Sequence, residues 1–534
     1  MKEFIEKHGS QIRGCLSGFD RLVFRGSLRS LNWGTYDEQR QVVVASGMEI
    51  YCWQNKILFK DYGRHVQQVS QRVKEHSLQP CLQAGAPVEF VRDSGVDKDK
   101  LAREIAERRK VESGMVCAIS ALEPAPTFDY RKSRIVRRLR PCHVLYQYQI
   151  HPILGWMHAR LQTWFPFHIQ IAVNGREWLS RRMQQEGMKY TQVGNCFPWI
   201  EDFEQAQQWM EEQLTTSWRE LLDSFAAVLN PLHEEIFAQF PASYYWTCYQ
   251  SEWATDLVFA DAGYLKRLMT VLTPHAITNF HSVDVLRYFG KRIKQDGSIP
   301  ANFEGQLQGN LREYREGERV KFWAKGNSLK FYSKAFVAEG SVLRAAETTI
   351  NHPEMLRAYR PKEGGPEEDL QWRPMRKGVA DLHRRAVVSQ QINERLIGAL
   401  AATDDSARLE ELMAPLQKRV SWKGRRVRGL RPLADDYRLL EAISRGELLL
   451  HGLRNRDLQA LLYDKPAANE REKRKRSAAV SRKLRMLRAH GLIHKVPRQH
   501  RYQIPAQARP ALLAILTAAR TSLNEINALR SKVA

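Results

Sequence analysis

The segment SAAVSRKLRMLRAHGLIHKVPRQHRYQI, residues 477–504, determines how the C-terminal part of the chain is interpreted. It opens with Val480, Leu484 and Leu487 at positions i, i+4 and i+7. This spacing predicts a helix with one apolar face, because residues three and four apart lie on the same side of an α-helix.

The ends of this helix and the chain after it also carry signals. Ser477 is expected to cap the helix, and Gly491 to end it in the left-handed conformation. A short strand is expected to start at Leu492 and Ile493, followed by a basic tip at 495–501 and a returning strand at 501–504. The predicted order is helix, strand, basic tip, strand.

The charge of this region has a single sign. Eleven Lys or Arg residues and no Asp or Glu lie between Lys473 and Arg501, although like charges at i and i+4 repel. A polyanion would balance such a run, whereas a solvated helix face would be expected to mix both signs. We therefore predict nucleic-acid binding by Arg476, Arg482, Lys483, Arg485, Arg488, Lys495, Arg498 and Arg501.

Residues 431–518 resemble winged-helix DNA-binding domains of the MarR and ArsR type in this order of elements. The resemblance implies that the basic helix enters the major groove of DNA and that the basic tip touches the backbone. It covers about a sixth of the chain and rests on pattern, not on one rigid motif.

Length, charge and cysteine content limit the possible class of the whole protein. The 534 residues predict two to four domains, and the net charge of +24 with a pI near 9.8 indicates an anionic partner. The seven cysteines are scattered without a CxxC pair, which favours reduced thiols and a cytoplasmic protein. No run of 18 apolar residues and no apolar signal-peptide core is present, so no membrane association is expected.

Alternating strand and helix signals predict an α+β (mixed α/β) fold with several domains. The expected division is an α/β domain at 1–200, a helical segment followed by antiparallel strands at 201–360, a linker and basic helical segment at 361–430, and a winged helix-turn-helix domain with a C-terminal helix at 431–534. Within the second part, residues 232–300 are predicted to be helical.

One candidate metal site lies at His168 and Gln170. Apolar Ile169 and Ile171 alternate with them, so both side chains are expected on one face of a strand. Two such ligands can hold Mg²⁺ or Mn²⁺ beside a nucleophile. The pattern resembles a degenerate His-hydrophobe-His motif of rolling-circle replication initiators, with Gln170 in place of the second histidine. A structural histidine is the open alternative.

A second candidate is GNSLKFYSKAFVAEGSVLRAAETTIN, residues 326–351. Lys330 and Lys334 share a strand face with Tyr332, and this hairpin resembles the K-x-Y-x-K … R-x-E pattern of plasmid and phage replication proteins. Here Arg344 and Glu347 are spaced R-x-x-E, which places them on opposite faces unless a bulge intervenes. Basic side chains facing solvent are the structural alternative.

A third candidate is the set of tyrosines Tyr244, Tyr245 and Tyr249. Tyr245 and Tyr249 share a face on helical spacing, and a tyrosine hydroxyl can attack a DNA phosphate. We predict Tyr245, Tyr249 and Glu347 as catalytic residues, with core packing or base stacking by the tyrosines left open. Asp20 and Glu123, which also lie near strand ends, offer a Mg²⁺-nuclease alternative.

The chain is also similar, over 17–29, 160–179, 244–256 and 376–385, to a group of uncharacterised bacterial mobile-element-like proteins. The prediction is a DNA-binding protein of a mobile element, with replication-initiator-like or transposase-like DNA processing as a further hypothesis. A non-enzymatic winged-helix regulator and an RNA-binding accessory protein are the alternatives. A homodimer formed through the apolar stripe of 510–530 is also left open.

Overall fold

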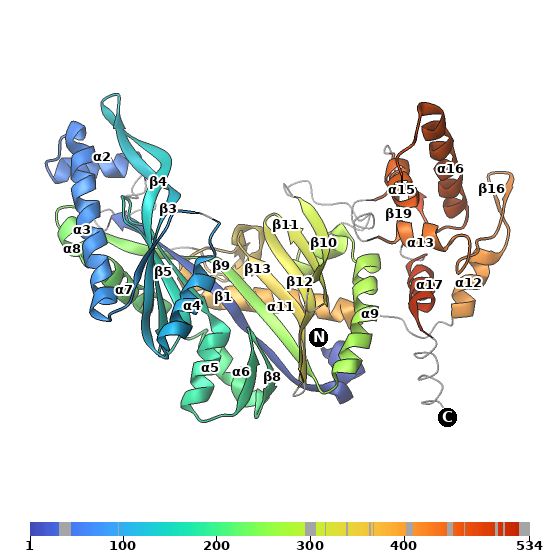
Figure 1. Cartoon of the computed structure of the whole chain (residues 1–534), viewed down its shortest axis with the longest axis horizontal. Coiled ribbons are helices and arrows are strands. Elements are labelled where there is room, and N and C mark those ends of the chain that lie inside the picture. The colour runs from blue at the N-terminus through green and yellow to red at the C-terminus, as the bar shows by residue number, and fades with distance from the viewer. Residues whose placement is uncertain are drawn as a thin grey trace. The chain divides into compact units, whose positions relative to one another are not determined.

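The computed structural model describes residues 1–30, 44–93, 95–293, 306–314, 317–337, 340–362, 365, 366, 368–401, 409–445, 452–463, 465–496, 500–505 and 508–522. These residues form a mixed α/β protein with one large sheet (Figure 1), which confirms the predicted fold class at this level. None of the described helices combines the length and the apolar composition needed to cross a bilayer.

Eleven strands make up the large sheet. In spatial order they are β10 (Leu307–Tyr314), β11 (Gly317–Ala324), β12 (Asn327–Val337), β13 (Gly340–Ile350), β9 (Ala242–Phe259), β1 (Ile12–Ser30), β6 (Ile169–Asn174), β5 (Gly155–Gln162), β4 (Arg134–His151), β3 (Gly114–Arg131) and β2 (Val88–Val91). The run from β1 through β6, β5 and β4 to β3 is antiparallel, and β2 pairs with β3 in parallel.

The chain divides into two compact units. Unit 1 contains Met1–Cys15, Asp256–Glu347 and Gln391–Ala534, and unit 2 contains Leu16–Thr255 and Thr348–Gln390. Both units are assembled from separated segments, in contrast to the consecutive domains expected from the sequence.

Unit 2 buries one face of its strands beneath helices. Phe24, Leu161 and Ile171 point into this core, because apolar residues alternate along β1, β5 and β6. The helices that contribute to it include α2 (Ala45–Gln54), α3 (Tyr62–Gln83), α5 (Gly175–Gln185), α6 (Phe203–Glu212) and α7 (Trp218–Leu229). A smaller core forms where Ala102 and Ile105 of α4 (Lys98–Arg109) pack near Tyr148.

The predicted helix over 232–300 is wrong for its first part. Beyond the short α8 (His233–Ile236), residues 242–259 form strand β9, and helices follow only at α9 (Ala262–Asn279) and α10 (Ser282–Tyr288). The reason is a period of two: Tyr244, Trp246 and Cys248 are buried, while Tyr245, Thr247 and Tyr249 are not.

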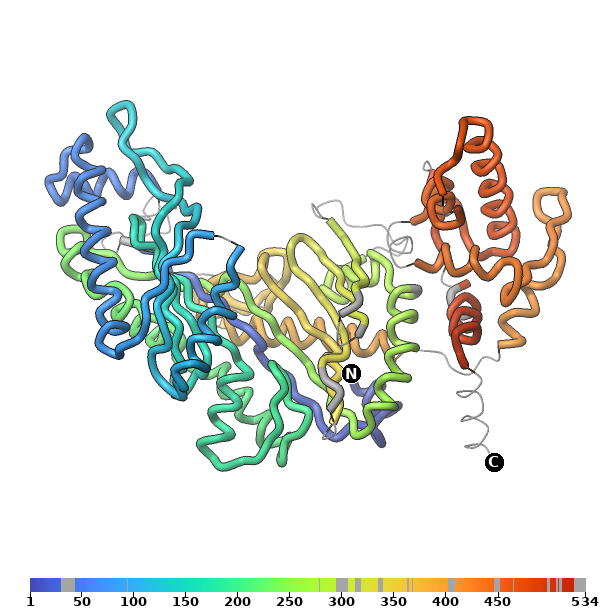
Figure 2. Tube along the Cα trace, viewed as in Figure 1, coloured from blue at the N-terminus to red at the C-terminus, as the bar shows by residue number. Residues whose placement is uncertain are grey.

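Strands β3 and β4 form a long hairpin whose tip projects from unit 2 (Figure 2). Its turn residues Lys132 and Ser133 both have positive φ, at 46° and 62°, which matches the geometry of a tight hairpin turn. The tip is strongly basic and exposed, with cationic side chains at Arg131, Lys132, Arg134, Arg137, Arg138 and Arg140.

In unit 1 the strands β10–β13 bury Val320, Phe322, Leu329 and Phe331 on one side. The N-terminal helix α1 (Lys2–His8) belongs to the same unit, and His8 Nδ1 lies 2.8 Å from the Tyr264 hydroxyl of α9. The second half of helix α11 (Leu382–Ala401) also belongs to unit 1, where the Asn393 side-chain amide donates a hydrogen bond to the Ala346 carbonyl.

The C-terminal part of unit 1 is mostly helical. Its elements are α12 (Leu409–Gln417), the hairpin β16 (Val420–Trp422) and β17 (Arg425–Val427), α13 (Tyr437–Ile443), α15 (Asn455–Leu462), α16 (Glu470–Ala489), the hairpin β18 (His494–Lys495) and β19 (Tyr502–Gln503), and α17 (Arg509–Arg520). Leu512 and Ile515 of α17 lie in the local core, which accounts for its apolar stripe within the chain.

Helix α16 starts earlier than predicted. Asn469 caps it by accepting from the Glu472 N–H, so Ser477 lies inside the helix and the expected cap there is wrong. The stop is confirmed, because Gly491 has a φ of 71° just after the helix. The two strands begin at His494 and Tyr502, slightly later than expected.

Candidate functional site

Helix α16 carries a basic stripe. Val480, Leu484 and Leu487 face the core, and the opposite side exposes Arg471, Arg474, Lys475, Arg482 and Arg485, which we call the α16 stripe. Within the described part of the chain, none of these five cations forms an ion pair with a carboxylate. Their charges therefore remain available to an external anion.

The hairpin β16–β17 lies against α16. The Arg488 guanidinium is 5.0 Å from the centre of the Trp422 ring, and the Lys423 ammonium is 5.3 Å from it. Exposed Arg425 and Arg426 on the same hairpin add further positive charge. Arg488, predicted to bind nucleic acid, is thus partly engaged in holding this hairpin.

The other predicted cations of this region differ in accessibility. Arg476 is bound internally: it donates to Glu472 and to the Lys465 carbonyl and lies 4.7 Å from the Tyr463 ring centre. Lys495 is exposed on β18 and Arg501 is half-buried, while Arg498 lies outside the described residues.

The charge of Lys483 acts on Asp436. Burial acts to raise the pKa of Asp436, but hydrogen bonds from Arg428 and the Arg431 N–H, together with the charges of Arg428 and Lys483, bring that pKa below its usual value. Lys483, predicted to bind nucleic acid, therefore interacts with a carboxylate of its own domain.

A second polar surface crosses the sheet of unit 2. Arg25 is the cross-strand partner of Gln170, Gln170 of Arg160, and Arg160 of Tyr146. On the other side of β1, the Arg25 guanidinium lies 4.5 Å from the Tyr249 ring centre. Cross-strand partners share a sheet face, so these five residues form one line across β9, β1, β6, β5 and β4, here called the transverse row.

The next residues along β1 extend this surface. Ser27 Oγ is 3.3 Å from His168 Nδ1, and the Arg29 guanidinium lies 3.4 Å from the Tyr245 ring centre. Four predicted site residues, Tyr245, Tyr249, His168 and Gln170, therefore gather on one face of the sheet. For His168 and Gln170, this is the arrangement that the alternation with Ile169 and Ile171 predicts.

The electrostatics around His168 favour an anion. Burial, followed by the charges of Arg25, Arg137 and Arg160, lowers the pKa of His168 to about 4, so the imidazole is neutral at pH 7. Gln170 stands between Arg25 and Arg160, which would repel a cation. Among the described residues, no three His, Cys, Asp or Glu side chains group as metal ligands. The Mg²⁺ or Mn²⁺ prediction stays untested, and the charges here do not fit it.

These histidines predict acid sensitivity. Burial and the charge of Arg21 also lower the pKa of His158 to about 4, against a usual 6.5. The unfolded chain then binds more protons between pH 6.5 and 4, so stability falls as the pH is lowered through this range. We expect His158→Gln with His168→Gln to reduce, by about 3 kcal/mol, the loss in free energy of unfolding between pH 6.5 and pH 5, as measured by urea unfolding at each pH. An unchanged slope would contradict these pKa values.

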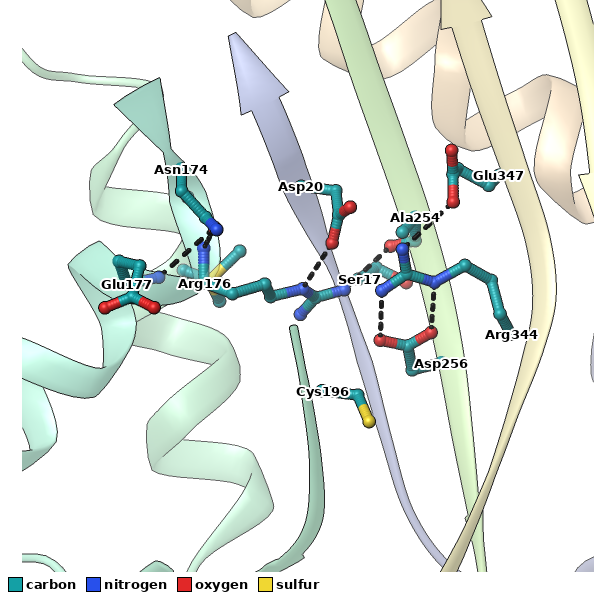
Figure 3. A network of polar contacts seen from close by, with 12 residues as sticks. Ser17, Asp20, Asn174, Arg176, Glu177, Cys196, Ala254, Asp256, Arg344 and Glu347 are labelled. Atoms are coloured by element: carbon teal, nitrogen blue, oxygen red, sulfur yellow. Dashed lines mark hydrogen bonds and ion pairs between the residues drawn. The ribbon is translucent and has the colours of Figure 1, made fainter. Parts of the chain in front are cut away.

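The carboxylates of the nuclease alternative are each bound by cations. Glu123 contacts Lys98 at 3.3 Å and Arg160 at 2.9 Å, and it accepts from the Tyr146 hydroxyl at 2.7 Å. Asp20 lies 3.6 Å from the fully buried Arg176, which also donates to the Ala254 carbonyl (Figure 3). In these positions both carboxylates act in internal ion pairs.

The predicted hairpin residues of unit 1 meet in a buried network (Figure 3). Arg344 forms two hydrogen bonds with Asp256, at 2.8 and 2.9 Å, and one with Glu347 at 3.0 Å. Glu347 is also paired with Lys330 at 2.5 Å and lies 3.3 Å from the Tyr332 hydroxyl. Arg344 and Glu347 therefore contact each other directly, which differs from the opposite faces expected for this spacing in the absence of a bulge.

The side chains of this network are largely buried, which affects the catalytic and binding roles predicted for them. Glu347 is 1% exposed and the Lys330 side chain 13%, so their charges mainly compensate one another. Lys334 is half-buried. This arrangement fits a structural ion network better than the predicted catalytic role of Glu347.

Two groups of cationic side chains were not predicted from the sequence as candidate binding residues. Arg21, Arg25 and Arg29 of β1 recur at i, i+4 and i+8, an even spacing that places all three on one strand face. The six cations of the β3–β4 tip were missed because no Asn-Gly or Asp-Gly marks the turn at Lys132–Ser133.

Comparisons with protein-family models, with curated proteins and with solved structures found no match.

Proposed function

We propose that this chain is a nucleic-acid-binding protein that engages duplex DNA through α16. The observation that carries the proposal is the α16 stripe, whose five exposed cations form no ion pair with a carboxylate in the described part of the chain, although the charge of Lys475 also acts on Glu472. Phosphate contacts from such side chains supply most of the sequence-independent affinity for DNA.

The order of elements supports a winged-helix interpretation of this region. Helices α13, α15 and α16 precede the hairpin β18–β19, and the main chain of Leu453 also pairs with Tyr502 of this hairpin. In such a domain α16 would enter the major groove and the exposed Lys495 would touch the backbone. The link to a mobile element remains a proposal that rests on the sequence resemblance alone.

The salt dependence of duplex binding tests the proposal. Each phosphate contact contributes about 0.9 to the slope of log K against log salt concentration. We expect Arg482→Ala with Arg485→Ala to reduce this slope by about 2. Fluorescence anisotropy with a labelled duplex, measured across a series of salt concentrations, gives both slopes.

The matched control is Lys100→Ala with Arg108→Ala on α4, which removes the same charge from an exposed helix of unit 2. The control should keep the slope of the unchanged protein. Equal slopes for all three proteins would contradict binding by α16.

Strand cleavage is a second candidate function, and the exposure of Tyr249 favours it over cleavage by Tyr245. Tyr249 is 47% exposed beside Arg25, on the face that also holds neutral His168. Its phenolic oxygen would attack a phosphorus atom and form a phosphotyrosyl ester while the sugar hydroxyl leaves. A covalent protein–DNA band on a denaturing gel, tested with and without Mn²⁺ and lost in Tyr249→Phe, is the expected result; intact DNA under every condition would contradict it.

A further inference from the structure

Three arginines line the open part of the unit 2 sheet. Arg21, Arg25 and Arg29 lie on one face of β1, with roughly 14 Å between consecutive members at the usual rise of a strand. Arg21 and Arg25 are exposed, and none of the three forms an ion pair with a described carboxylate. Arg160 and Arg140 differ, since they pair with Glu123 and Asp129 at 2.9 and 2.8 Å.

Aromatic rings accompany two of these arginines. Tyr249 lies beside Arg25 and Tyr245 beside Arg29, so the same guanidinium–phenol pair occurs twice on β1 and β9. Stacking on a ring orders a guanidinium group but leaves its charge uncompensated. A ligand that suits this surface therefore carries both negative charge and flat, stackable groups.

We infer that the transverse row and the neighbouring Tyr245–Arg29 pair form a binding platform for single-stranded nucleic acid. Arg25 and Arg29 would bind phosphates, Tyr249 and Tyr245 would stack on bases, and the Gln170 amide would hydrogen-bond to base edges. At about 4.8 Å between strands, the five residues of the row span roughly 19 Å, which accommodates several nucleotides. Duplex DNA fits less well, because its base faces are already stacked.

The β3–β4 hairpin adds positive charge to this platform. Arg137 is one of the cations that lower the pKa of His168, which contacts Ser27 next to the transverse row. The exposed cations of the tip extend the positive potential beyond the sheet. Such a field attracts a polyanion and increases its rate of association.

This inference uses different residues from those of the duplex proposal. The platform belongs to unit 2 and the α16 stripe to unit 1. Either proposal can therefore fail without the other, provided that single-strand binding is measured in the Arg482→Ala, Arg485→Ala background.

The test is the affinity of the full chain for a labelled 12-nucleotide single strand, as oligo(dT) and as oligo(rU). We expect Tyr249→Ala to weaken binding about tenfold, the usual effect of losing one base stack, and Tyr249→Phe to bind as tightly as the unchanged protein. Arg25→Ala should reduce both affinity and salt dependence. The two oligonucleotides reveal whether the physiological strand is DNA or RNA.

Tyr359→Ala is the matched control, because Tyr359 is 53% exposed on β14 (Arg357–Arg360) in unit 2 and outside the row. Circular dichroism checks that each variant is folded. Unchanged single-strand affinity in both Tyr249→Ala and Arg25→Ala would overturn the inference. It would also be overturned if Tyr249→Ala weakened the binding of a 12-base-pair duplex as much as that of the single strand.

Discussion

Replacing Arg344 with alanine is expected to lower the free energy of unfolding of unit 1 by about 3–5 kcal/mol. Arg344 is fully buried and binds both Asp256 and Glu347, whose side chains are 4% and 1% exposed. Its removal deprives two buried carboxylates of the cation that they share, while Glu347 keeps its ion pair with Lys330. An uncompensated buried charge is costly because the interior solvates ions far less well than water does. Urea unfolding, monitored by circular dichroism, measures the effect.

Two comparisons isolate the charge effect. Arg431→Ala breaks an ion pair with Asp435 whose partners are 71% and 67% exposed, and it should cost less than about 1 kcal/mol. Arg344→Met combined with Asp256→Asn and Glu347→Gln removes the buried charges together, and it should recover part of the loss. If Arg344→Ala costs no more than Arg431→Ala, the buried network is not stabilising in the way described.

Gly175→Ala is expected to destabilise unit 2 by about 3 kcal/mol. A Cβ atom at this position would lie 2.0 Å from the Phe19 carbonyl oxygen, which is part of the β1 backbone. The clash is not easily relieved, because the Asn174 side chain caps the start of α5 by accepting from the Arg176 and Glu177 N–H groups. Either the helix or the central strand must shift.

Gly63→Ala is the matched control for this substitution. Gly63 lies in the first turn of α3, and a Cβ atom there meets no atom within 4 Å. Alanine at this site should be neutral or stabilise by up to about 1 kcal/mol, because glycine is a poor helix former. Equal urea midpoints for the two variants would contradict the close approach of α5 to β1.

The local spacing of apolar residues was sufficient to predict many of the helices and strands. The apolar face of α16 lies where the spacing of Val480, Leu484 and Leu487 predicts it. The start of α16 was missed because its first two turns are polar and carry no apolar repeat. Asn469, with its side chain bonded to the Glu472 N–H, was the available signal.

The platform of unit 2 shows where local pattern is insufficient. Tyr249, Arg25, Gln170, Arg160 and Tyr146 come from five strands, and the chain order of these strands differs from their order in the sheet. Which residues stand side by side depends on the register of distant strands, and a shift of one residue would turn each side chain to the other face. The residue types were visible in the sequence, but their alignment was not.

Because unit 1 is built from separated segments, its N-terminal helix cannot complete its native contacts until much later residues have been synthesised. The Gln11 carbonyl accepts a hydrogen bond from the Ala260 N–H, and His8 contacts Tyr264, so the first helix is bound by residues about 250 positions later. A ribosome adding roughly 5–20 residues per second needs about 10–50 s to reach them. During that interval Phe4, fully buried in the finished fold, has no permanent site. The nascent chain therefore exposes the Phe4 side chain to solvent until the middle of the protein has emerged.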